Sequence, residues 1–393
     1  MNKQKNFIYI SILYNPNIYR DRFKLLIEEQ NLHKDKNIVI IGRPFNKNIE
    51  LKNIELINSK SYFSFAIKTA FLIRKIKKKH KATLIINEHL VGLAGFITKI
   101  LNFKNVIRIA NLYSSEFYFI YKKGWRIDPN GRNFIEFKQK FKILLSRIKP
   151  ILYRLITIWS ADFYIGNSKQ IIHDINDKKK NNFFVTNTNI DIFPDIHSLS
   201  KPSQFLDNKI HLLYVGKIYP AKGIGTLFSA ISQLKGNNHK LHLLLIGKIA
   251  KNDKNWFENL IRYYNIENHI THIGPIDQQE LFSYYKYTNA FIMPSFFEGS
   301  PRVLKEALIA GCPIIASNIE GNKILETNQN NIKYFEPGNA NDLKKLIVEI
   351  TQTQRHINQT QGVDFYKKFS SISIAKDRIN IYSEIINRNN KKY

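Results

Sequence analysis

The feature that most constrains the fold of this chain is an alternation of short apolar runs with longer amphipathic stretches along its whole length. The apolar runs fit buried β-strands, and the stretches between them have the period of helices that cover a sheet. This order is typical of βαβ units, which build parallel sheets. We therefore predict an α/β protein. Because 393 residues exceed one ordinary hydrophobic core, we expect two domains.

The expected elements form two similar halves. In the first half we expect strands at 7–13, 37–41, 83–87, 105–109, 162–166 and 183–186, with helices at 20–31, 63–79, 90–101, 134–159 and 168–177. In the second half we expect strands at 210–216, 241–247, 270–273, 290–293, 313–316 and 332–335, with helices at 223–235, 254–264, 277–287, 301–310 and 339–352. The expected domains are 1–195 and 209–365, joined by a polar linker at 196–208 and followed by a helix at 366–393 that crosses back to the first domain.

The charge of the chain points to an anionic partner. The net charge is +29, and residues 1–200 hold 35 basic and 15 acidic residues, a net +20. Nucleic acid, an acidic membrane surface and a phosphorylated substrate are the candidate partners. A composition rich in Lys, Asn and Ile explains part of the total charge, but it does not readily explain the asymmetry.

Two basic stretches have the pattern of helices that lie on a membrane surface. Residues 62–81 form an apolar helix pattern that ends in a dense basic run, and 134–159 mixes apolar residues with Lys and Arg. Such helices bind anionic lipids. The alternative is that both are ordinary surface helices with an apolar stripe on the sheet, and this alternative is favoured for 134–159.

The remaining composition bears on the location of the chain. A single cysteine, Cys312, excludes a disulfide framework and a Cys-rich metal site, and suits a reducing compartment. The first apolar run, residues 7–14, lacks a following cleavage site and is interpreted as a strand rather than a signal peptide. No apolar run is long enough to span a membrane. We expect a cytoplasmic protein, peripheral on the inner face of the cytoplasmic membrane.

The strongest chemical signal is a pair of carboxylates around a helix start. Glu298 is followed by Gly299, Ser300 and Pro301, and Glu306 lies eight positions after Glu298. A helix that begins at Pro301 places Glu298 in a loop and Glu306 about one and a half turns into the helix. The free N–H groups of the helix start between them suit a phosphate.

A second group of residues precedes this one in the same predicted sheet. The strand at 210–216 ends at Gly216, and Lys217 and Lys222 follow before a helix that starts after Gly223. Ligands of open α/β sheets bind at the carboxyl ends of the strands, so both lysines are placed to meet an anion there. Lysines and a helix dipole suit a diphosphate, and carboxylates accept hydrogen bonds from sugar hydroxyls. Together these parts fit a nucleotide-sugar.

The motif spanning 298–311 resembles the E-x7-E motif of the retaining glycosyltransferases of family four, which have the two-Rossmann GT-B architecture with parallel sheets facing across a cleft. Other stretches resemble the same family: Val215-Gly216-Lys217 with Lys222-Gly223, the loop 273–276, the Ala161-Asp162 to Asn167-Ser168 strand, and the stretches 315–326 and 335–338. The similarity is strong over about 210–340 and weaker over 80–190. It is specific for the family and uninformative about the sugar.

The resemblance implies a role for each motif residue. Glu298 would contact the donor sugar, and Glu306 would bind the nucleotide ribose. Lys217 and Lys222 would neutralise the departing diphosphate, which needs no metal or other cofactor, and no Asp-x-Asp strand end is present. The residues expected to complete the donor site are Gly216, Ile276, Gly299, Ser300, Arg302 and Val303. Lys305 is expected to face solvent.

The chain also departs from the family pattern. Residues 13–17 replace a Gly-Gly loop, and Asn111 stands where a His is common. His89 resembles a family position near the acceptor, although a lone His is more often structural. These two residues, His89 and Asn111, are the acceptor-side candidates.

Three functions compete at this stage. The favoured one is a retaining, metal-independent glycosyltransferase that acts on a lipid-linked or membrane-proximal glycan, and the chain resembles bacterial enzymes of O-antigen, capsule or lipopolysaccharide synthesis. A nucleotide-sugar epimerase or phosphorylase on the same fold is the second. A basic nucleic-acid-binding protein is the third, and no binding motif supports it.

Overall fold

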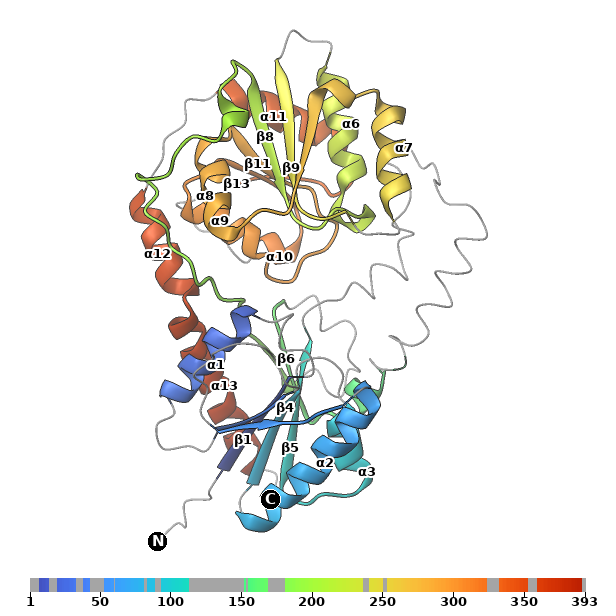
Figure 1. The fold of residues 1–393 in the computed structure, drawn as a ribbon, viewed down its shortest axis with the longest axis vertical. Coiled ribbons are helices and arrows are strands. Elements are labelled where there is room, and N and C mark those ends of the chain that lie inside the picture. The colour runs from blue at the N-terminus through green and yellow to red at the C-terminus, as the bar shows by residue number, and fades with distance from the viewer. Residues whose placement is uncertain are drawn as a thin grey trace. The chain divides into compact units, whose positions relative to one another are not determined.

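The computed structural model divides the chain into two compact units, each built around a parallel sheet (Figure 1). The first unit contains the described residues up to Asp191 together with those from Ser370 onward, and the second contains Ile192 to Phe369. The residues expected to form a linker, 196–208, belong to the second unit. The structure describes residues 7–13, 20–32, 38–42, 53–59, 61–80, 83–88, 93–112, 152, 155–168, 181–235, 240–249, 253–323, 332–352 and 359–390.

The described strands of the first unit form one seven-stranded sheet in the spatial order β3-β2-β1-β4-β5-β6-β7, with every neighbouring pair parallel. The strands are β1 Phe7–Leu13, β2 Ile38–Gly42, β3 Ile54–Leu56, β4 Thr83–Glu88, β5 Val106–Leu112, β6 Phe163–Gly166 and β7 Phe183–Val185. The strand order reverses between β1 and β4. Such a reversal is where open α/β sheets bind ligands, at the carboxyl ends of the strands.

Helices cover both faces of this sheet (Figure 1). On one face Ile8, Ile10 and Ile12 pack against α2 (Tyr62–Lys79) and α3 (Leu93–Ile100). On the other face Tyr9 packs with α1 (Arg20–Leu32) and α13 (Ser371–Asn390). This alternation follows from the period of two in a strand and explains why the strands are apolar throughout. A buried ion pair between Glu29 and Arg378 joins α1 to α13.

The described strands of the second unit form a six-stranded parallel sheet in the order β10-β9-β8-β11-β12-β13. The strands are β8 Ile210–Val215, β9 Leu241–Ile246, β10 Ile270–Gly274, β11 Ala290–Met293, β12 Ile314–Ser317 and β13 Ile332–Phe335. The order reverses between β8 and β11. The loops after these two strands carry the two motifs singled out from the sequence.

The second unit also has helices on both faces of its sheet (Figure 1). Helices α6 (Ile224–Leu234), α7 (Lys254–Tyr264) and α11 (Ala340–Gln352) share a core with Leu212, Tyr214 and Ile292. On the other face Phe291 meets Tyr285 of α8 (Gln278–Tyr287), with ring centroids 5.5 Å apart. Helix α9 (Arg302–Ile309) packs between α8 and α12 (Gln359–Phe369), and the short α10 is Glu320–Lys323.

The structure confirms the expectation of two α/β domains with parallel sheets. All the expected strands are present, with ends displaced by at most three residues. Strand β3 and helix α10 were not predicted, because they are too short to show a period. One helix was predicted at the end of the chain, where α12 and α13 follow each other. The expected helix at 134–159 lies largely outside the described residues, as does nearly all of 168–177. Within the described part of the chain, no helix has the length and hydropathy needed to cross a bilayer.

Candidate functional site

The candidate site lies at the carboxyl edge of the sheet of the second unit, where the loops after β8 and β11 meet. The backbone of Phe296 donates a hydrogen bond to the carbonyl of Ala221, with N and O 3.1 Å apart. Gly223 packs so closely that a Cβ would lie 1.9 Å from the carbonyl oxygen of Pro294, and its φ of 70° also favours glycine. The two motifs therefore form one structure.

An ion pair joins the motifs. Nζ of Lys222 lies 2.7 Å from Oε1 of Glu298, and the side chains are 21% and 13% exposed. The ring of Tyr219 has the ammonium groups of Lys217 and Lys222 each 5.7 Å from its centroid. Two cations and a carboxylate thus converge beside the end of β8. This combination can bind a diphosphate and a hydroxyl at the same time.

Glu306 lies on α9 and is held by two donors from α8. Nε2 of Gln278 donates to its Oε1 at 2.6 Å, and the hydroxyl of Tyr285 donates to its Oε2 at 3.3 Å. Burial, and then the charge of Glu306, raise the pKa of Tyr285 well above its ordinary value, so Tyr285 remains a neutral donor. Glu306 is 4% exposed, and these two hydrogen bonds hold its carboxylate in position. A fixed acceptor of this kind suits the hydroxyls of a ribose.

The structure corrects the expectation for Lys305, which is buried rather than exposed to solvent. Its Nζ donates to Oγ of Ser300 at 2.6 Å and lies 4.6 Å from the ring centroid of Phe369. Burial, and then the positive charge of Arg302, lower the pKa of Lys305 well below its ordinary value, while Glu306 opposes this. Through these two side-chain contacts, Lys305 connects the Glu298 loop to the end of α12.

Replacing Lys305 with Met is expected to stabilise the protein at neutral pH. The folded pKa of Lys305 lies below its unfolded pKa, so between the two values the unfolded chain binds more protons and wild-type stability rises with pH. The advantage of Lys305→Met should therefore be larger at about pH 7 than at about pH 9.5. Melting temperatures of both proteins at the two pH values test this. A difference that does not shrink with pH would contradict the buried-lysine explanation.

Most of the remaining donor-site residues lie at the same edge of the sheet. Gly216 follows β8 with a φ of 147°, and Gly299 and Ser300 are buried in the loop before α9. Arg302 and Val303 are half-buried in the first turn of α9, and Ile276 is half-buried in the loop before α8. The helix begins at Arg302, with Pro301 as its N-cap, one residue later than expected.

The acceptor-side candidates are in the first unit or outside the described residues. Asn111 is buried near the carboxyl end of β5, where the side chain is 5% exposed. His89 and the residues 14–17 that replace a Gly-Gly loop lie outside the described residues. The acceptor-side role of His89 remains a prediction.

A buried polar group that was not predicted from the sequence supports the Glu298 loop. Oγ of Ser317 donates to the carbonyl of Ser295, and Nδ2 of Asn322 donates to the carbonyl of Ser317 at 2.9 Å. Gly321 of α10 packs on the loop, where a Cβ would lie 2.0 Å from the carbonyl oxygen of Glu298. The glycine after 317–320 was the available signal, but only the fold brings it to Glu298.

Parts of the chain resemble known glycosyltransferases in sequence. Residues 195–361 match the family Glycosyl transferases group 1. An uncharacterised glycosyltransferase of Methanocaldococcus jannaschii is 29% identical over 175 residues, which cover 44% of this chain and 48% of that one. Protein CapJ of Staphylococcus aureus is 29% identical over 157 residues, covering 39% of each chain. The chain thus spans less than half the length of these relatives.

Solved structures match almost the whole chain. Sucrose-phosphate synthase from Thermosynechococcus elongatus aligns with a TM-score of 0.66 at 18% identity, covering 97% of this chain and 100% of that one. The HepE protein of Anabaena in complex with UDP-glucose aligns with a TM-score of 0.65 at 15% identity, covering 96% of this chain and 100% of that one. The lipopolysaccharide outer core galactosyltransferase WaaB aligns with a TM-score of 0.64 at 16% identity, covering 96% of this chain and 99% of that one.

These likenesses show the two-domain GT-B fold. The group 1 match covers the unit that holds the candidate site, and with the glycosyltransferase relatives it supports a transferase enzyme. At identities below a fifth, the solved structures carry the argument for the fold alone.

Proposed function

We propose that this protein is a retaining glycosyltransferase that moves a sugar from a nucleoside-diphosphate donor to a glycan acceptor, without a metal or other cofactor. The observation that carries the proposal is the Lys222–Glu298 ion pair in the loops that precede α9, the helix that carries Glu306, at one sheet edge. The edge lies at the reversal of strand order, where α/β sheets take their ligands. The group 1 match over the same residues supports it.

Each part of the site has a task in the proposed reaction. Glu306, held by Gln278 and Tyr285, accepts hydrogen bonds from the ribose. The N–H groups at the start of α9 and the ammonium groups of Lys217 and Lys222 hold the diphosphate and stabilise its charge as it departs. Glu298 accepts a hydrogen bond from a hydroxyl of the donor sugar. The Anabaena HepE complex with UDP-glucose, a protein of the same fold, supports a nucleotide-sugar as the ligand.

The acceptor that we propose is a lipid-linked or membrane-proximal glycan of the bacterial surface, such as O-antigen, capsule or lipopolysaccharide. WaaB, and WaaG, which is named for a role in lipopolysaccharide biosynthesis, share the fold. CapJ is a sequence relative. The basic charge of the first 200 residues supports an anionic membrane surface as the workplace of the protein, on its cytoplasmic face.

Replacing Glu306 with Gln is expected to abolish stabilisation by the correct donor. A ligand that binds only the folded protein raises its melting temperature by an amount that depends on its affinity. Screening UDP-, GDP-, CMP- and dTDP-sugars should give one clear shift for the wild type. Glu306→Gln keeps the shape of the side chain but replaces one acceptor oxygen with a donor, so the shift should disappear.

The same experiment includes a control variant and separates the proposal from its two alternatives. Tyr285→Phe removes one hydrogen bond to Glu306 and keeps the carboxylate, so it should retain most of the shift. A donor that is converted to another nucleotide-sugar without acceptor would indicate an epimerase. No shift with any nucleotide-sugar, together with tight binding of one nucleic-acid sequence, would contradict the proposal in favour of a nucleic-acid-binding protein.

A further inference from the structure

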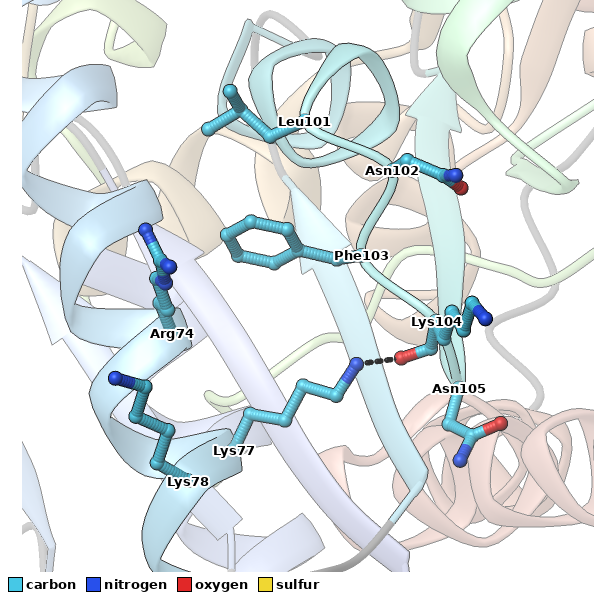
Figure 2. Close-up of a pocket in the computed structure, with 8 residues that line it drawn as sticks. All are labelled: Arg74, Lys77, Lys78, Leu101, Asn102, Phe103, Lys104 and Asn105. Carbon is cyan, nitrogen blue, oxygen red and sulfur yellow. Dashed lines mark hydrogen bonds between the residues drawn. The ribbon is translucent and has the colours of Figure 1, made fainter.

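A cavity of about 730 Å³ opens on the first unit, at the edge of the sheet opposite to the carboxyl ends of its strands. One wall is the end of α2, with Arg74, Lys77 and Lys78, and the other is the loop 101–105 between α3 and β5 (Figure 2). Both walls precede the first residues of β4 and β5. The cavity therefore lies at the amino edge of the sheet, away from the edge where such sheets take catalytic ligands.

The cavity is lined by cations and holds no acid. Its charged lining residues are Arg74, Lys77, Lys78 and Lys104, and the other members are Leu101, Asn102, Phe103 and Asn105. Figure 2 shows Arg74 and Lys78 projecting from α2, while Lys77 reaches across to the carbonyl of Lys104. Among the described residues, Arg74 and Lys78 form no ion pair. Four positive charges around one cavity favour an anion.

Two observations indicate that the cations are more than helix capping. The negative end of the α2 dipole stabilises Lys77, Lys78 and Lys79 in the last turn, but Arg74 lies further back along the helix. Burial, and then the positive charges of Arg108 and Lys104, lower the pKa of Lys77. The cations therefore repel one another, and an anion in the cavity would relieve that repulsion.

Exposed apolar side chains on α2, at the cavity and beside α3 distinguish between a lipid phosphate and a free phosphate as the anion. Phe71 is 63% exposed and precedes Arg74 by about one helical turn, and Leu101, which lines the cavity, is 55% exposed. Trp159, 53% exposed, packs on α3, where Nζ of Lys99 lies 4.7 Å from its ring centroid. Exposed aromatic residues beside cations are typical of proteins that lie in the headgroup region of a bilayer.

We propose that this cavity binds the phosphate group of an anionic phospholipid and that α2 and the loop 101–105 dock on the membrane surface. Arg74 and Lys78 contact the phosphate, and Phe71 and Leu101 enter the boundary between headgroups and acyl chains. The inference rests on the membrane part of the proposed function and deepens it by naming the surface and the lipid chemistry. It does not depend on donor binding in the second unit.

Co-sedimentation of the full chain with vesicles of phosphatidylcholine, with and without phosphatidylglycerol, tests the inference. The Arg74→Gln/Lys78→Gln variant should bind anionic vesicles at least about tenfold more weakly than the wild type. The matched control, Lys24→Gln/Lys376→Gln, removes the same charge from exposed lysines of α1 and α13, on the other face of the sheet, and should bind as the wild type does. Melting temperatures confirm that both variants fold.

Three results would overturn the inference. Equal losses in the two double variants would show that net charge, and not the cavity, attracts the vesicles. Absence of wild-type binding to anionic vesicles would remove the membrane surface altogether. Phe71→Ser should also weaken vesicle binding. If it leaves vesicle binding unchanged while inorganic phosphate competes fully, the cavity takes a free phosphate and not a lipid. The nucleotide-sugar melting shift, measured on the same variants, should be unchanged whichever result is found.

Discussion

Replacing Lys222 with Met is expected to lower kcat/KM for the proposed sugar transfer by about two to three orders of magnitude, the usual cost of losing one preorganised group that stabilises transition-state charge. The ammonium group of Lys222 lies 2.7 Å from Glu298 and the side chain is only 21% exposed, so the group is already fixed in position without a ligand. In the proposed reaction, its charge is needed most when the diphosphate departs. Steady-state rates with the donor found by thermal shift give the measurement.

A double variant separates this role from a structural one. Lys222→Met alone leaves the largely buried carboxylate of Glu298 without its cation, so the melting temperature should fall. Adding Glu298→Gln removes that charge and should restore the melting temperature, while kcat/KM should stay low because both groups act on the donor in the proposed reaction. Recovery of activity in the double variant would mean that Lys222 only neutralises Glu298. Lys248→Met, at an exposed lysine after β9, is the control for charge alone.

The sequence was sufficient for the features that repeat along the chain. Apolar runs predicted the strands, because strands buried on both faces of a parallel sheet are apolar throughout. The loops after β8 and β11 could be placed at one edge because they follow the carboxyl ends of strands in the same parallel sheet. The structure joins these loops through Lys222 and Glu298. Lys222 and Glu298 could be recognised as candidates because each is a charged residue next to a glycine, just before a helix, and such a pattern is visible in a short stretch of sequence.

What the sequence could not show depends on contacts between distant segments. Lys305 was expected to face solvent because lysines are seldom buried, yet Ser300 and Phe369 surround it. Phe369 lies 64 positions after Lys305, so no local sequence pattern predicts the contact between them. The cavity beside Arg74 likewise needs α2 and the loop 101–105 to meet. The dense basic run in 62–81 was visible, but the opposing wall was not.

Gly321 is the position where the smallest change is expected to have a large effect on the site. A Cβ added there would lie 2.0 Å from the carbonyl oxygen of Glu298 and 3.0 Å from that of Gly299. Both contacts are to backbone, so either α10 or the Glu298 loop must move by about 1 Å. A displacement of that size costs about a hundredfold in rate when it affects a group that acts on the substrate, as proposed for Glu298. Gly321→Ala should therefore lower kcat/KM by about that factor.

A second glycine provides the control for packing. A Cβ at Gly362 of α12 would lie 2.4 Å from the carbonyl oxygen of Ile309, at the far end of α9. Both substitutions overpack a backbone contact, so each should cost about 1–3 kcal/mol of stability and lower the melting temperature. Only Gly321→Ala should reduce the rate of the protein that remains folded, because only that contact bears on Glu298. If Gly362→Ala reduces the rate equally, general loosening of the second unit, and not the position of the Glu298 loop, limits transfer.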